Sequence, residues 1–274
     1  MLKSLSASLR LPAFFRIFRA QAPAIYLVVA LSGFIAGESG AGIMLSVITV
    51  ALFSIGIWAL DDYVDRDLDA VLHPRRVIPS GALSPRAVLE ISAFSLSLSL
   101  SSSILKLIFL GDAILAIIVL IELILGILAV ELTREDLLDH GSRMLLKALL
   151  TGAMISLIFP AGGGLSHMMI ILGLMVGMAH IANTLAIHDK KPTKTSLTKI
   201  LSPSLYLASM ISGWIAYLTE MFHKLTMIPL TLISISELIL MMEARRGMGR
   251  LRARLVAGIG KISTLAILLI EALL

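Results

Sequence analysis

Long apolar stretches, each separated from the next by glycine, proline or a cluster of charges, recur along the whole chain of 274 residues. Each has about 17–25 residues, which is the length that crosses the hydrocarbon core of a bilayer as a helix. The residues do not alternate between polar and apolar in the way that indicates a membrane β-barrel. The pattern predicts an all-α bundle of nine transmembrane helices, near residues 22–38, 41–60, 87–109, 112–132, 145–162, 167–187, 200–219, 225–242 and 256–274.

The composition supports an integral membrane protein. The chain is 58% hydrophobic and 15% charged, with a mean hydropathy of +0.97, which lies outside the range of ordinary soluble domains. A net charge of +5 is compatible with a nucleic-acid partner. The basic residues are dispersed, however, and lack interleaved aromatic residues, so we expect no nucleic-acid binding. The absence of cysteine excludes disulfides and thiolate metal ligands.

The basic residues also predict how the chain crosses the membrane. Nearly all of them fall before the first span or in the even-numbered loops, and only Lys106 and Lys224 are left for the opposite face. Cytoplasmic loops carry the excess of Lys and Arg, so we expect a cytoplasmic N-terminus and an external C-terminus. We expect residues 1–20 to be a retained basic amphipathic segment, and residues 1–274 to form one membrane domain in a prokaryotic cell membrane.

The most polar part of the chain follows the second predicted span. Residues 58–85 read WALDDYVDRDLDAVLHPRRVIPSGALSP and contain five aspartates within nine positions. Asp61, Asp65 and Asp69 are four residues apart, so a helix that continues past the span would place them on one face. Carboxylates that converge in this way suit Mg2+, which commonly uses one or two of them together with water and phosphate oxygens. A solvated loop of paired acids and arginines is the alternative. We favour a magnesium diphosphate site in the loop 61–86, because the acids lie directly at a membrane boundary.

Other polar residues leave two interpretations open. In the loop 188–199, Lys190, Lys191 and Lys194 could bind a diphosphate, or could serve only to orient the chain. Within the spans, Glu122 and Glu237 are either neutral packing residues or, for one of them, part of a polar substrate chamber.

The run that starts at Asp61 resembles the first signature of the UbiA-type intramembrane prenyltransferases. That family has Asn-Asp-x-x-Asp-x-x-x-Asp after its second helix, followed by a Pro, an Arg and Ile-Pro-Ser-Gly. This chain has Asp61-Asp62-Tyr63-Val64-Asp65-Arg66-Asp67-Leu68-Asp69, and then Pro74, Arg75, Arg76 and the run Ile78-Pro79-Ser80-Gly81. The second family motif, Asp-x-x-x-Asp after the sixth helix, corresponds to Asp189-Lys190-Lys191-Pro192-Thr193, with Thr193 in place of the second acid.

The resemblance implies a helical bundle with a central chamber, in which Mg2+ joins two Asp-rich motifs to the diphosphate of an isoprenyl donor. It implies a catalytic, Mg2+-binding role for Asp61, Asp65, Asp69 and Asp189, and diphosphate binding by Arg75, Arg76, Lys190, Lys191 and Lys194.

The function expected from this resemblance is that of a membrane prenyltransferase. It would transfer an isoprenyl group from a polyprenyl diphosphate to a lipophilic acceptor, either a quinone precursor or a glycerol phosphate ether lipid. The incomplete second motif motivates an alternative, a catalytically impaired relative that binds isoprenoid or lipid or scaffolds membrane enzymes. A transporter that uses Glu122 and Glu237 ranks last, because no internal repeat or broken helix is visible.

Overall fold

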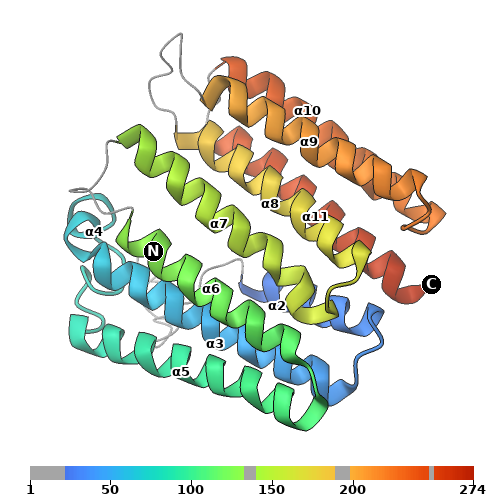
Figure 1. Ribbon diagram of the computed structural model, residues 1–274. Helices are drawn as coiled ribbons and strands as arrows, with labels where there is room; N and C mark the ends of the chain where they lie inside the picture. The colour runs from blue at the N-terminus through green and yellow to red at the C-terminus, as the bar shows by residue number, and fades with distance from the viewer. Residues whose placement is uncertain (1–21, 133–139, 189–197, 247–249) are drawn as a thin grey trace, which may run out of the picture.

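The computed structural model describes residues 22–132, 140–188, 198–246 and 250–274, and within them the chain is helical, without a strand. The long helices lie side by side along one common direction and form a single bundle (Figure 1). In chain order the elements are α2 (Ala22–Ile35), α3 (Gly40–Val64), α4 (Arg66–Leu72), α5 (Pro85–Leu110), α6 (Ala113–Glu131), α7 (His140–Gly163), α8 (His167–His188), α9 (Thr198–Leu218), the 3-10 turn η2 (Lys224–Thr226), α10 (Met227–Arg246) and α11 (Arg250–Leu273).

The expected all-α membrane bundle is confirmed, with one difference in the number of long spans. Among the described residues, eight helices, α3 and α5 to α11, are long and apolar enough to cross a membrane. The predicted span 22–38 is instead the 14-residue helix α2, which ends at Ile35. At about 1.5 Å per residue it covers about 21 Å, less than the roughly 30 Å of a hydrocarbon core. Large apolar side chains such as Phe94 and Phe109 are exposed on the outside of the bundle, as expected of a surface that faces lipid.

Helices α3 and α5 pack closely because small polar residues line their interface. The Ser92 hydroxyl donates to the Gly56 carbonyl at 2.8 Å, and the Ser99 hydroxyl donates to the Thr49 carbonyl at 2.9 Å. The Thr49 hydroxyl in turn donates to Ser102 Oγ at 2.8 Å. Small residues let two membrane helices approach, and hydroxyls then bond across the contact. This packing of α3 against α5 holds the end of α3, from which the acidic segment continues.

A buried lysine fastens the end of the bundle that lies farthest from α4. Lys106, near the end of α5, is only 1% exposed, and its ammonium lies 2.7 Å from Asp112 Oδ2 and 3.4 Å from Glu38 Oε1. It also donates to Ser46 Oγ at 3.0 Å. Asp112 caps α6 and Glu38 lies between α2 and α3, so one cation connects the α2–α3 and α5–α6 junctions. Lys106, which was expected on the outer face, is therefore a structural residue that stabilises that end of the bundle.

Candidate functional site

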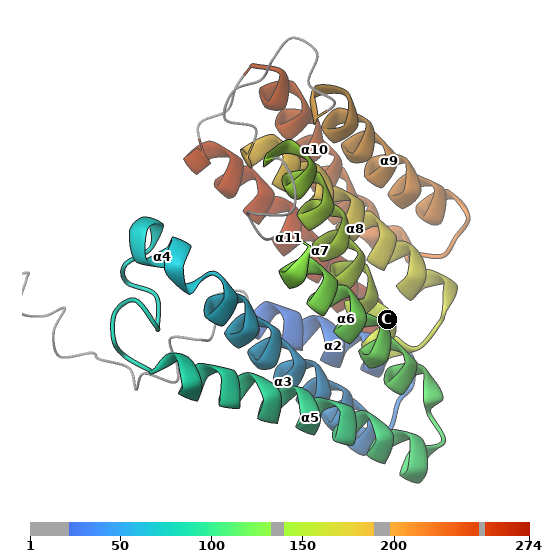
Figure 2. The ribbon, with the colours of Figure 1, turned by 60° about the vertical axis from the view of Figure 1, so that its left-hand side comes forward.

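The acidic segment is helical on both sides of a single break. Helix α3 ends at Val64, Asp65 has φ −82° and ψ 5°, and α4 begins at Arg66. Backbone hydrogen bonds continue across the break, from Asp65 N to Asp61 O at 2.9 Å and from Asp69 N to Asp65 O at 2.8 Å. Asp67 and Asp69 lie in the first turn of α4, where negative side chains favourably oppose the helix dipole. Figure 2 shows α4 beyond the end of α3, with the chain running back from it to the start of α5.

The loop after α4 is anchored by apolar residues, and this anchoring positions Arg76. Val77 is 1% exposed and belongs to a buried cluster with Trp58 of α3 and Val88 of α5. The next helix, α5, is capped by Ser84, whose hydroxyl accepts from Ala87 N, and it begins at Pro85. Because the residue after it is fixed in the core, Arg76 is held beside the acidic segment.

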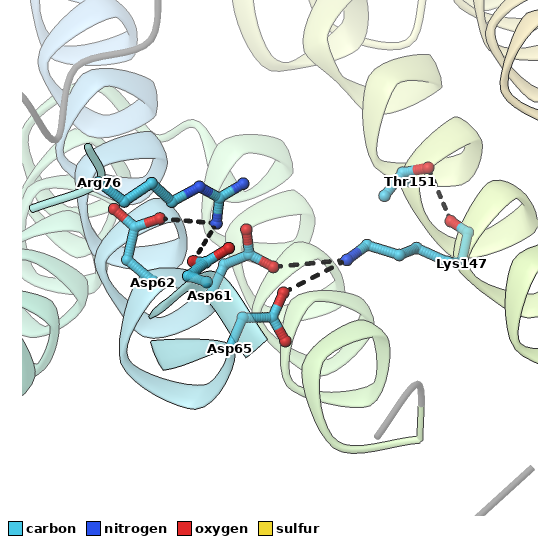
Figure 3. A network of polar contacts seen from close by, with 7 residues as sticks. Asp61, Asp62, Asp65, Arg76, Lys147 and Thr151 are labelled. Carbon is cyan, nitrogen blue, oxygen red and sulfur yellow. Dashed lines mark hydrogen bonds and ion pairs between the residues drawn. The ribbon is translucent and has the colours of Figure 1, made fainter. Parts of the chain in front are cut away.

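Arg76 pairs with two of the aspartates. Its Nη1 lies 2.7 Å from Asp69 Oδ2 and 3.2 Å from Asp62 Oδ1, and both aspartates are buried (Figure 3). Burial by itself favours the neutral guanidine, but the charges of Asp69, Asp62 and Asp61 outweigh it and raise the pKa of Arg76 above its ordinary value. The Arg76 side chain is 32% exposed, so part of it is accessible from outside this cluster.

Lys147, near the start of α7, lies between the other two aspartates of the cluster. Its ammonium is 3.6 Å from Asp61 Oδ1 and 3.9 Å from Asp65 Oδ2 (Figure 3). The Thr151 hydroxyl donates to the Lys147 carbonyl at 2.7 Å, one turn further along α7. Burial raises the pKa of Asp65, and the nearby negative charge of Asp61 adds to this effect, which Lys147 partly offsets. Two segments far apart in the chain thus meet in one charged cluster.

The expected site residues are therefore only partly brought together. Asp61 and Asp65 share the Lys147 ammonium, whereas Asp69 pairs with Arg76. Arg75 is exposed, while Arg76 is engaged. Asp189, Lys190, Lys191 and Lys194 lie outside the described residues. Sequence reasoning missed Lys147, because a lysine near the end of a predicted span is explained equally well by membrane orientation.

The residues fit a magnesium ion with two carboxylates and not with three. Within the described ranges, no group of three His, Cys, Asp or Glu side chains converges closely enough to hold a metal ion. Asp61 and Asp65 nevertheless both face one ammonium group, which shows that a cation is accommodated between them. Mg2+ commonly uses one or two carboxylates and completes its shell with water and phosphate oxygens, so this pair is a suitable donor set.

A cavity of about 200 Å³ lies elsewhere in the bundle, among α2 and the helices α7 to α11. More than half of its lining residues are apolar, of the types Ile, Val, Met, Leu, Phe and Ala. Glu237 of α10 lines it, whereas Glu122 of α6 does not. Of the two intramembrane acids, Glu237 is thus the one that borders a chamber.

The fold is shared with two solved structures. A structure of digeranylgeranylglyceryl phosphate synthase has a TM-score of 0.71 at 15% identity, and the match covers 93% of this chain and 97% of that protein. A UbiA homologue from Archaeoglobus fulgidus, bound to GPP and Mg2+, has a TM-score of 0.67 at 15% identity, with coverage of 96% and 100%. No protein-family model matches the sequence, and no curated protein matches it. The expected resemblance to UbiA-type prenyltransferases is confirmed at the level of the fold.

Proposed function

We propose that this protein is a membrane prenyltransferase, which moves an isoprenyl group from a polyprenyl diphosphate to a lipophilic acceptor. A quinone precursor and a glycerol phosphate ether lipid are the two acceptor classes that we favour. The observation that carries the proposal is the cluster of acids and cations at the end of α3, where Asp61 and Asp65 enclose a cation beside Arg76. The fold shared with a UbiA homologue bound to GPP and Mg2+ supports it.

Asp61 and Asp65 are the residues that we assign to Mg2+, with Asp189 of the second motif as a further ligand. When bound, the ion would neutralise charge on the diphosphate as that group leaves. Asp69 was expected to be a metal ligand as well. Because it is buried and bonded to Arg76, we assign it instead to holding the guanidinium in place.

Arg76 and Lys147 supply positive charge that stays with the protein. The Arg76 side chain is partly exposed and is paired with two acids, so it can bind diphosphate oxygens without losing its position. Lys147 can do the same from α7 once a metal ion takes its place between Asp61 and Asp65. We expect Lys190, Lys191 and Lys194 to add to this charge. The carbon–oxygen bond of the donor breaks with its electron pair passing to the diphosphate, and the acceptor then bonds to the allylic carbon and loses a proton.

The dry interior of the bundle would protect the allylic cation from water. The distribution of basic residues supports an orientation with the acidic segment on the cytoplasmic side and the C-terminus outside. In the structure, the end of α11 lies at the opposite end of the bundle from α4, as this orientation requires (Figure 1).

One observation favours a second candidate function. Lys147 fills the space between two acids, and within the described ranges no third acidic or imidazole ligand joins them. A relative that binds an isoprenoid or lipid without transferring it would have these features. The two functions differ in whether the donor is consumed.

The test uses purified protein in bilayer nanodiscs, a donor radiolabelled in its isoprenyl group, Mg2+, and a lipid extract of the host as the acceptor source. We expect label to appear in a new lipid product, and we expect Asp65→Asn to abolish it. Asp67→Asn is the matched control, because the Asp67 side chain is 92% exposed and approaches only Arg66 among the ion pairs found, at 3.7 Å. Equal transfer by wild type and Asp65→Asn would refute the proposal, and donor binding without transfer would favour the second function.

A further inference from the structure

The cavity among α2 and α7 to α11 combines an apolar wall with a cluster of polar side chains. It is lined by residues of six helices, including α2 and α11 from the two ends of the described chain. Its polar lining consists of His180 and Asn183 of α8, Tyr206 and Ser209 of α9, Ser236 and Glu237 of α10, and Lys261 and Thr264 of α11. None of the aspartates of the α3–α4 segment lines it, so it is a separate feature of the bundle.

Three buried polar atoms of this lining lack a hydrogen-bond partner in the part of the chain that the structure describes. They are Oε2 of Glu237, the hydroxyl of Tyr206 and Oδ1 of Asn183. Glu237 is only 5% exposed and Tyr206 only 1%. Unpaired polar groups are costly to bury, and most buried polar atoms in folded proteins are paired. Three at one cavity therefore indicate that a group outside the described residues completes them.

The contacts of Glu237 show what kind of group Oε2 needs. Its other oxygen, Oε1, lies 2.7 Å from the Ser209 hydroxyl, and that hydroxyl also lies 3.0 Å from the Met175 carbonyl. A hydroxyl has one proton to donate. Both contacts are hydrogen bonds at once if Ser209 donates to Met175 while a protonated Glu237 donates to Ser209. In that arrangement Oε2 is a carbonyl oxygen that accepts, as is Oδ1 of Asn183, and the missing partner is a hydrogen-bond donor.

The charge of Lys261 at the cavity further restricts which type of hydrogen-bond donor the cavity can bind. Lys261 lines the same cavity, and a cationic amine placed there would be repelled by it. A neutral hydroxyl donates a hydrogen bond to Glu237 or Asn183 and accepts one from Tyr206, without a charge to desolvate. We propose that this cavity binds a lipophilic molecule that carries a hydroxyl group, with Glu237 and Tyr206 bonded to the hydroxyl and the apolar wall enclosing the rest. This binding site is additional to the diphosphate site and does not depend on prenyl transfer.

The experiment measures equilibrium binding of two probes that differ in one hydrogen-bond donor. These are para-pentylphenol and its methyl ether, para-pentylanisole, added to the wild-type protein in nanodiscs without donor substrate or Mg2+, with empty nanodiscs subtracted. We expect the phenol to bind more tightly by about threefold to tenfold, as the net effect of one hydrogen bond. We expect Tyr206→Phe, which removes only the hydroxyl, to weaken binding of both probes, because the oxygens of the phenol and of the methyl ether can both accept its hydrogen bond.

Glu237→Leu is the second variant, and it leaves Ser209 paired with the Met175 carbonyl. We expect it to abolish the preference for the phenol while the methyl ether still binds. Glu122→Leu is the matched control, because Glu122 is a buried acid at 3% exposure that does not line the cavity, and we expect its preference to equal that of wild type. Equal affinities of wild type for the two probes would overturn the proposal and leave water as the partner of these atoms. A preference that survives Glu237→Leu, or binding of both probes that is unchanged by Tyr206→Phe, would overturn it as well.

Discussion

Replacing Arg76 should destabilise the protein, because Asp69 would then be a buried carboxylate without its guanidinium. The two groups are 2.7 Å apart, and their side chains are 4% exposed for Asp69 and 32% for Arg76. Removing one partner from a fully buried ion pair costs about 3–5 kcal/mol, while exposed pairs contribute about 0–1 kcal/mol. The partial exposure of Arg76 places this pair between those limits, and for Arg76→Gln we expect a loss of about 2–3 kcal/mol in the free energy of unfolding.

The double variant Arg76→Gln, Asp69→Asn separates this stability effect from loss of the site. Removing the carboxylate as well should restore most of the lost stability, since no uncompensated charge stays buried. Prenyl transfer should stay absent, because the diphosphate still lacks the guanidinium. Stability is read from reversible unfolding in mixed micelles with increasing SDS, for wild type, both single variants and the double variant. Additive effects of the two substitutions would refute the reasoning, because they would show that Arg76 and Asp69 are not coupled.

Three further predictions follow from other parts of the structure. Gly173→Ala should lower the free energy of unfolding by about 1–3 kcal/mol, because a Cβ there would meet the Ser156 carbonyl of α7. Gly258→Ala is the control in the same unfolding assay. It should be neutral or stabilising, because a Cβ at Gly258 meets nothing described within 4 Å. Burial raises the pKa of Asp112, but the hydrogen bond from Lys106, the backbone hydrogen bond of Ile114 and the charge of Lys106 lower it overall. The ionised Asp112 therefore stabilises the folded protein above the unfolded-state pKa. This stabilisation is lost as pH falls through the lower folded-state pKa. Asp112→Asn keeps a side-chain acceptor for the α6 cap, and its deficit in melting temperature should therefore be clear at neutral pH and shrink below about pH 4; a deficit independent of pH would contradict this. Lys147→Gln should raise the affinity for Mg2+ measured by titration calorimetry, since the competing ammonium between Asp61 and Asp65 is gone, and an unchanged affinity would contradict the assignment of that pair.

Hydropathy predicted the helical bundle well, because a segment that crosses a bilayer must bond its own backbone and cover itself with apolar side chains. The difference concerns the first span, which was placed at 22–38, whereas the helix ends at Ile35 and Gly37 adopts φ 73°. Apolar composition alone does not locate such an end. The burial of Lys106 was also beyond sequence reasoning, since it depends on Glu38 approaching from the α2–α3 junction as well as on the nearby Asp112.

The acidic segment was found from the sequence because clustered carboxylates at a membrane boundary are costly without a purpose. Their partners could not be found in the same way. Spacing placed Asp61, Asp65 and Asp69 on one face, but the break at Asp65 and the anchoring of Val77 bring Asp69 to Arg76. Lys147 joins from a helix more than eighty positions away, and such a contact is set by packing between helices, not by local pattern.

Catalysis of prenyl transfer is tested by measuring release of pyrophosphate from geranylgeranyl diphosphate by the wild-type protein in nanodiscs with host lipid extract. The measurement is made in excess Mg2+ and again after chelation of divalent ions. The account predicts release in Mg2+, in step with loss of the donor, and none after chelation, because the acidic pair needs a metal ion to hold the diphosphate. Release at the same rate in both conditions, or no release in either, would contradict it.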